Sequence, residues 1–361
     1  SRRQRQMCIR DRGIITLLWG VIALGSLSSC DSAIYDDEGD CSVHYRVTFT
    51  YDMNMKWTNA FPHEVKSVTL YIYDRNGQLV MSKTDNSAAL ASPDYYMDVE
   101  VLPGKYDLLV WATGKSPVDN PTAFEVASAV QGSAMSTLGA KMPLDGTPAD
   151  GGYYVDRDIV PLYHGIMRGV DFPDTYGNVT LGPVSLTKDT NVMQVLLQNT
   201  DGTTMKADDF SFYITAANNE LDYLNKVVST TQFSYRPWAM TLTSASLDKP
   251  EAQAASKAPA RALTEANGIL AELSTGRLID TRTQRLVVRR NSDGEDIINI
   301  NLIQYLLMVK GEYNRQMSNQ EYLDRNDNYS LMFFVDDNRN WYIAGGVYIL
   351  SLIHISEPTR R

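Results

Sequence analysis

The residue with the most specific chemistry in this sequence is Cys30, which follows Leu27, Ser28 and Ser29 at the end of an apolar segment. Leu, two small residues and Cys in this position resemble a lipobox. Small residues let a peptidase hold an extended backbone, and a thiolate is the group that forms the thioether to diacylglycerol. We therefore predict lipidation of Cys30 and cleavage between Ser29 and Cys30. A cleaved secretory peptide with an incidental Cys is the alternative.

The apolar segment in front of this motif runs from Ile14 to Gly25. It is shorter than the ~20 helical residues that span a bilayer, and it has the length of an export-signal core. Residues 13–29 are therefore predicted to be a lipoprotein signal peptide. Acyl chains on the mature N-terminus each contribute about 0.8 kcal/mol per buried methylene, so we expect firm membrane anchoring.

Residues 30–40 form a short acidic run without the pattern of a packed core. Such a composition predicts a solvated tether between the membrane and the first domain. The run also resembles the acidic surface-export signal of lipoproteins, which would place the body of the protein outside the cell. A location facing the periplasm is the alternative.

The two ends of the chain differ from the rest in composition. Residues 1–12 are basic and lie in front of a complete signal segment, and residues 351–361 are equally unlike the preceding strands. Both resemble translated sequencing-adapter DNA, so we exclude them from the fold. The native C-terminus is then expected near Leu350. A genuine basic leader and tail are the alternative.

Charge and cysteine content narrow the function classes. With 43 Asp and Glu against 33 Lys and Arg, the formal net charge is −10, and an acidic protein repels phosphate backbones. We expect no nucleic-acid partner. If Cys30 carries lipid and Cys8 lies in the excluded leader, Cys41 has no partner, and a buried structural role is expected for it.

Residue types that could support catalysis or bind metal are scattered. The run Asp324 to Asn328 resembles the opening of a calcium loop, but Tyr329 and Val335 stand where an EF-hand needs Gly and Glu. A casual surface calcium site there, or at Asp336 and Asp337, is left open. The histidines of the body show no metal-ligand spacing: they are His44, His63 and His164.

Catalytic motifs are equally scarce. Asp156 and Asp158 flank Arg157 and could pass for paired carboxylates, but an alternating-sign loop is the simpler interpretation. The sequence contains neither a Gly-x-Ser-x-Gly elbow nor a P-loop. We therefore expect that the protein is not an enzyme and uses no catalytic residue, cofactor or resident metal.

The pattern of residues between the two ends of the chain predicts mainly β-strands. Apolar residues alternate from Val43 to Tyr51, which predicts a half-buried strand, and Asn76-Gly77 joins two β-rich runs as in a hairpin. Pro103-Gly104 predicts a second tight turn. Residues 41–165 are accordingly predicted to form an N-terminal β-sandwich.

A second block repeats this order. Val192 to Gln198 corresponds to the opening strand, and Phe210 to Leu221 aligns with Val68 to Leu79. Residues 166–350 are therefore predicted to form a C-terminal β-sandwich. The apolar segment Ile297 to Val309 fits either a buried strand or a helix, because periodicity does not separate the two.

These features together resemble the FimB-like lipoprotein anchor subunits of type V (fimbrillin) fimbriae, from about Leu27 to Val347. The resemblance is carried by the following segments: the lipobox, the acidic spacer to Cys41, Tyr45 to Met55, Val68 to Gly77, Pro103 to Tyr106 with Val110 to Ala112, and the Asp336 to Trp341 hairpin. The departure is at the C-terminus, where family members usually continue through the last strand.

The resemblance implies an all-β fold of two tandem transthyretin-like β-sandwich domains, lipid-anchored to the outer membrane. It also implies that the protein holds fimbrial shaft pilin subunits and limits shaft length. Accepting a donor strand at an open sheet edge would be the physical mechanism. A surface glycan- or host-binding lipoprotein is the alternative, with exposed indole rings stacking on sugars; the candidates are Trp57, Trp111 and Trp238.

Overall fold

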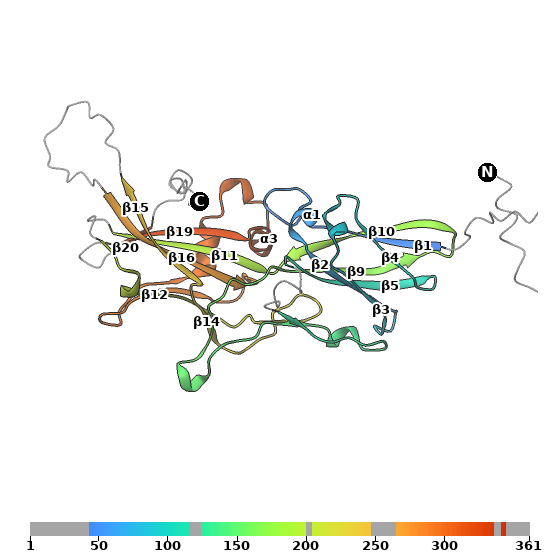
Figure 1. Ribbon diagram of the computed structural model, residues 1–361, viewed down its shortest axis with the longest axis horizontal. Coiled ribbons are helices and arrows are strands. Elements are labelled where there is room, and N and C mark those ends of the chain that lie inside the picture. Colours follow the sequence, from blue (N-terminus) through green and yellow to red (C-terminus); the bar gives the residue numbers. More distant parts are fainter. Residues whose placement is uncertain (1–42, 116–123, 200–203, 247–264, 336–340, 344–361) are drawn as a thin grey trace, which may run out of the picture.

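The computed structural model describes residues 43–115, 124–199, 204–246, 265–335 and 341–343. These residues form an elongated all-β body in which two sandwiches follow one another along the long axis (Figure 1). The all-β fold predicted from the sequence is confirmed. The predicted signal peptide, the tether and both excluded ends lie outside the described residues.

The first sandwich is one seven-stranded sheet that folds over on itself. Its strands, in spatial order, are β3 (Leu79–Asp85), β2 (Ser67–Tyr73), β5 (Gly104–Thr113), β9 (Leu162–Phe172), β10 (Gly177–Lys188), β1 (Val43–Thr50) and β4 (Tyr96–Val99). β10 makes the fold-over possible because its first part pairs with β1 and its last residues pair with β9.

The predicted alternation places the core of this sandwich. Tyr45, Val47 and Phe49 of β1 are buried, and they share one apolar cluster with Leu70 of β2 and Val110 of β5. The residues between them on β1 point the other way and are at least partly exposed. Period-2 alternation produces this arrangement because successive side chains leave opposite faces of a strand.

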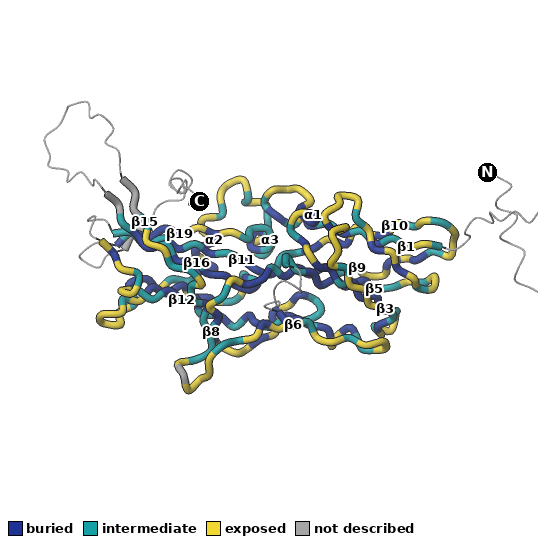
Figure 2. The backbone as a smooth tube through the Cα atoms, in the orientation of Figure 1, coloured by how far each residue is buried: buried dark blue, intermediate teal, exposed yellow. Residues whose placement is uncertain are grey.

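The second sandwich has two five-stranded sheets. One has the order β15 (Ala239–Ser246), β16 (Glu265–Gly276), β11 (Thr190–Asn199), β19 (Asn328–Val335) and β20 (Trp341–Ile343). The other has the order β18 (Asp296–Asn301), β17 (Arg285–Arg290), β12 (Phe210–Ala216), β14 (Phe233–Tyr235) and β8 (Tyr153–Val155). Buried apolar residues of both sheets meet in one cluster. Figure 2 shows buried segments, in dark blue, along the length of the body.

The strand order corrects the predicted division at residue 165. That position lies inside β9, and β10 continues the first sheet as far as Lys188, where sheet membership changes to β11. In addition, β8 precedes residue 165 but pairs with β14 of the second sandwich. Turn signals mark where strands end but not which sheet receives them, so the sequence placed the boundary too early.

A small third sheet also crosses between the two halves. It contains β13 (Glu220–Leu221), β7 (Ala140–Lys141) and β6 (Glu125–Val126). The segment between β5 and β9 is therefore shared: it supplies β6, β7 and β8, and its apolar side chains join the core of the second sandwich. The two sandwiches are interlocked along the chain.

The predicted turns form as local chemistry dictates. Asp74 accepts from the amides of Asn76 and Gln78, both at 2.9 Å, and Gly77 has a φ of +70° between β2 and β3. Gly supplies this left-handed conformation without a Cβ clash. Pro103-Gly104 instead connects strands at distant positions of the sheet, because β4 pairs with β1 and β5 with β2 and β9.

The ambiguous segment after Asp296 is both strand and helix. β18 ends at Asn301, whose side chain accepts from the amide of Gln304 at 3.2 Å and so caps α2 (Leu302–Met308). The other α-helices are α1 (Phe61–Glu64) and α3 (Asn319–Arg325). Short 3₁₀ turns span Ala88–Ala91, Met135–Thr137, Pro148–Asp150, Ala207–Asp209 and Glu312–Asn314. None of the helices in the described ranges has both the length and the apolar composition that a membrane span requires.

The internal repeat seen in the sequence has a counterpart in the pairing. The opening strand of each sandwich lies parallel to a later strand of the same sheet: β1 pairs with β10, and β11 pairs with β19. β2 and β12, which the sequence alignment matched, each lie between two antiparallel neighbours. The two halves differ after these strands, because β13 pairs with β7 where β3 pairs with β2.

Candidate functional site

The predicted lipidation motif, Leu27, Ser28, Ser29 and Cys30, lies outside the described residues, as does Cys41. Lipidation therefore stays a prediction. The structure does place the first strand: β1 lies toward one end of the long axis (Figure 1). The opposite end of the long axis belongs to the second sandwich (Figure 1).

At that opposite end lies the outer strand β15, the first candidate site (Figure 1). β15 pairs with β16 over its full length, from Ala239 to Ser246, and has no second neighbouring strand among the described residues. An edge strand presents a row of backbone donors and acceptors that another strand can pair with. This arrangement can bind an extended segment of a partner.

The side chains near this edge include exposed apolar groups. Leu242 of β15 is 57% exposed, and Trp238, just before the strand, is 38% exposed. Two residues before Trp238 in the chain, the guanidinium of Arg236 lies 4.0 Å from the ring centre of Tyr154. Aromatic and arginine side chains of this kind are typical of protein-binding surfaces.

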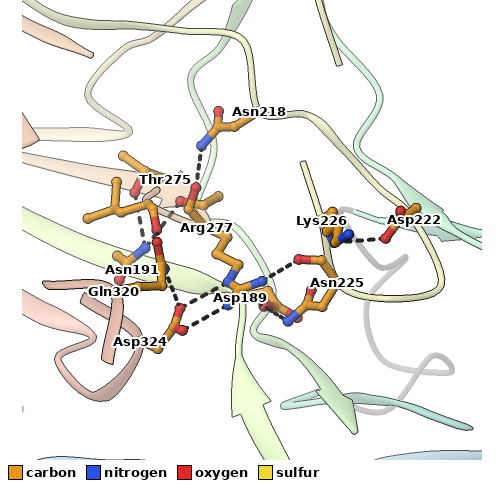
Figure 3. A network of polar contacts seen from close by, with 12 residues as sticks. Asp189, Asn191, Asn218, Asp222, Asn225, Lys226, Thr275, Arg277, Gln320 and Asp324 are labelled. Atoms are coloured by element: carbon orange, nitrogen blue, oxygen red, sulfur yellow. Dashed lines mark hydrogen bonds and ion pairs between the residues drawn. The ribbon is translucent and has the colours of Figure 1, made fainter. Parts of the chain in front are cut away.

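A second candidate site is a buried polar network where the two sandwiches join (Figure 3). Asp189 stands between β10 and β11 and is fully buried. Its Oδ1 accepts from Asn225 Nδ2 at 2.8 Å and lies 3.7 Å from Arg277 Nε. Arg277 in turn donates to both oxygens of Asp324, at 2.9 and 2.8 Å. One arginine thus faces two carboxylates.

The charges of this network are unequally compensated. Burial raises the pKa of Asp189 to about 7, because the attraction of Arg277 and the hydrogen bond from Asn225 offset only part of the desolvation. The second oxygen of Asp189 and the Oδ1 of Asn225 have no hydrogen-bond partner among the residues that the structure describes. The pKa of Arg277 is raised despite the opposing effect of burial, chiefly by its hydrogen bonds to Asp324. The network fits a structural joint better than a catalytic centre.

Further contacts join the two sandwiches on the face near α1 and α3. Lys188 lies 3.3 Å from Glu64 and 2.5 Å from Asp327. The guanidinium of Arg325 lies 4.3 Å from the ring centre of Trp57. The pairs Lys188–Asp327 and Trp57–Arg325 each bring a residue of the first sandwich against one that ends or follows α3, whereas Lys188 and Glu64 both belong to the first sandwich.

The predicted aromatic candidates separate into exposed and buried ones. Trp57 is 63% exposed and Trp238 is partly exposed. Trp111 is buried in the core, with its ring 4.7 Å from that of His164 in an edge-on arrangement, so it cannot stack on a sugar. Trp111 is buried because its face of β5 is covered by an apolar cluster that the segment between β5 and β9 and the second sandwich supply.

Several of the polar residues weighed for catalysis or metal binding are engaged in structural contacts, and Asp336 and Asp337 lie outside the described residues. Asp324 binds Arg277, and Asp158 lies 3.3 Å from Lys115. His164 is buried, its Nε2 lies 3.0 Å from the carbonyl of Tyr223, and burial lowers its pKa to about 4. Within the described ranges, no group of three or more His, Cys, Asp or Glu side chains could hold a metal ion.

Sequence reasoning missed the buried network. Its signal was present in Lys188-Asp189-Thr190-Asn191, a polar run directly between two apolar strands. Burial of Asp189 and its pairing with Asn225 and Arg277 depend on segments far away in the chain, so spacing could not reveal them.

Comparisons with known proteins agree with this architecture. The minor fimbrium anchoring subunit Mfa2 of Porphyromonas gingivalis (strain ATCC 33277) is 28% identical over 101 residues, which are 28% of this chain and 31% of that protein. The crystal structure of a candidate adhesin from Bacteroides thetaiotaomicron VPI-5482 is 30% identical, with a TM-score of 0.68, over 84% of this chain and 95% of that one.

The structure of the fimbrial anchor protein Mfa2 from Porphyromonas gingivalis shares the fold, with a TM-score of 0.56 at 12% identity, over 84% of this chain and 96% of that one. The family model of the fimbrillin-A associated anchor proteins Mfa1 and Mfa2 matches residues 37–356. That match includes both sandwiches and the segments that interlock them, so this chain belongs to the family of fimbrillin-A associated anchor proteins.

Proposed function

We propose that this protein anchors a fimbrial shaft to the outer membrane, through lipid on Cys30 at one end and through a donor strand accepted at the other. The membership of the chain in the fimbrial anchor family supports the general role. The carrying observation is the position of β15, an open edge strand at the end of the molecule opposite the start of β1. A shaft subunit is the proposed donor.

The proposed arrangement would also limit shaft length. The lipid end stays at the membrane and accepts no further subunit, so each anchor ends one row of subunits. Strand addition supplies main-chain hydrogen bonds for affinity and side-chain pockets for specificity. The role requires neither a catalytic residue nor a cofactor.

The proposed role of β15 as the accepting edge is tested by introducing a charge on this strand. Because the sandwiches share strands, deleting one of them would disturb the other, and point variants are preferable. Leu242→Lys places a charge on the edge, which opposes strand pairing. We expect at least a fivefold lower retention of fimbriae on cells and weaker capture of purified shaft pilin.

The matched control is Leu102→Lys. Leu102 is 79% exposed and precedes β5 in the first sandwich, so the same change there should leave retention unaltered. Equal loss of retention in both variants, or none in Leu242→Lys, would contradict the assignment to β15.

The test of the lipid anchor compares two cysteines. Cys30→Ser should abolish incorporation of radiolabelled palmitate and release the protein from the membrane fraction, because a hydroxyl forms no thioether. Cys41→Ser should retain both properties. Mass spectrometry that finds an unacylated N-terminus on the wild-type protein would overturn this part of the proposal.

A further inference from the structure

The loop between β1 and α1 holds Trp57 exposed and in an unusual backbone conformation. The side chain is 63% exposed, and the residue has a φ of +54°, in the left-handed region that bulky residues seldom adopt. Such a conformation persists only where the surroundings impose it, and it is concentrated at functional sites. Here it presents a large indole ring to solvent.

Hydrogen bonds fix the loop on both sides of this residue. Asn54, which is buried, donates from Nδ2 to the carbonyls of Tyr51 and Thr58, both at 2.8 Å, and its Oδ1 accepts from the amide of Lys56 at 2.9 Å. The Oδ1 of Asn59 accepts from the amides of Tyr51 and Phe61, both at 3.0 Å. The indole therefore projects from a rigid frame.

Arg325 of α3 fixes the ring itself. Its guanidinium carbon lies 4.3 Å from the ring centre of Trp57, and Nη1 donates to the carbonyl of Asp52 at 3.0 Å. Its Nε donates to Glu321 at 2.9 Å. The cation lies over the indole, and Trp57 nevertheless stays exposed to solvent.

The surroundings of the ring decide which ligand it suits. Trp57 is the one large apolar side chain that the described loop 52–60 exposes. Its neighbours are polar: Lys56 is 75% exposed and lies 3.8 Å from Glu64, and Thr58 and Asn59 are exposed. A protein-binding hot spot is typically an aromatic group within a wider, water-excluding contact area. A solitary flat ring with hydroxyl-binding groups around it fits a sugar better.

We propose that Trp57 is the stacking platform of a carbohydrate-binding site for a hexopyranose unit. The C–H face of the sugar would lie on the indole, and its hydroxyl groups would bind Lys56 and the Oε1 of Glu64. The other oxygen of Glu64, Oε2, accepts from Tyr163 and Lys188 and holds this carboxylate in place. Arg325 is a positioning residue, which holds the ring ready for the ligand. This inference does not depend on the anchoring role, because the loop lies away from β15 (Figure 1).

The test is titration of the full-length protein with cellohexaose and mannohexaose, followed by calorimetry, with sorbitol as an acyclic polyol that offers hydroxyls without a ring face. We expect at least one hexasaccharide to bind and sorbitol not to bind. Trp57→Ala should weaken binding about tenfold or more. Trp57→Gly should weaken sugar binding equally. Because Gly adopts the left-handed backbone without strain, an equal loss would show that the missing ring, and not a change in backbone strain, weakens binding.

Two further variants make the result specific. Tyr176→Ala removes an exposed aromatic ring just before β10 and is the matched control; it should leave the affinity unchanged. Arg325→Lys should weaken binding less than Trp57→Ala, since an ammonium still attracts the ring but positions it less rigidly.

Four outcomes would overturn the proposal. Neither hexasaccharide binds, or sorbitol binds as well as they do. Alternatively, Trp57→Ala leaves sugar binding unchanged, or replacement of Trp57 abolishes capture of shaft pilin and not sugar binding. The last outcome would make the ring a protein contact.

Discussion

Asp189, buried where the two sandwiches join, makes the stability of the protein depend on pH. Its pKa is raised to about 7 by burial, so the folded protein binds a proton that the unfolded chain releases near pH 4. The stabilising effect of that proton is complete below the unfolded pKa, and it is lost as the pH rises through the folded pKa. We therefore predict that stability declines between about pH 4 and pH 7.

The variant Asp189→Asn tests this prediction, because the amide keeps the shape and does not titrate. The measured quantity is the free energy of unfolding in urea from pH 4 to pH 8. Relative to the variant, the wild type should lose stability on the order of 3 kcal/mol over this range. Parallel pH profiles of the two proteins would show that Asp189 does not carry the dependence.

At the scale of elements, the junction of β18 and α2 depends on one cap. Asn301 ends the strand and accepts from the amide of Gln304, so it satisfies one of the free donors of the first helical turn. Asn301→Ala should therefore lower the free energy of unfolding by about 1 kcal/mol. Asn301→Ser retains a capping oxygen and should cost much less. Urea unfolding of both variants checks the difference.

At the scale of the whole molecule, the interlocked sheets predict cooperative unfolding. β8 lies in the second sandwich although the chain returns to the first one at β9, and one apolar cluster contains both Trp111 of β5 and Val195 of β11. Separation of the halves would expose that shared cluster to water, at about 25 cal/mol per Å² of apolar area.

Native-state hydrogen exchange measures this coupling. The slowest amides of β2 and of β12 should exchange with the same free energy of opening, since both would require global unfolding. Opening of the β12 sheet at a clearly lower free energy than the β2 sheet would show that the sandwiches unfold independently.

The sequence by itself determined the local structure of this protein. Alternation from Val43 to Tyr51 predicted β1, and Asn76-Gly77 predicted the hairpin of β2 and β3, because side-chain period and turn conformation depend on neighbouring residues alone. The motif at Cys30 and the order of strand-rich segments were sufficient to indicate the anchor family. The transthyretin-like subclass and the lipid stay predictions.

The tertiary structure decided what depends on distant partners. Sheet membership changes after Lys188 and not at residue 165, because β10 finds its partners in β1 and β9. The exposure of the tryptophans differs for the same reason: Trp111 is buried in the core on a central strand, whereas Trp57 is exposed on a loop beside Arg325. Burial and pairing arise from residues far apart in the chain, which no local pattern of side chains encodes.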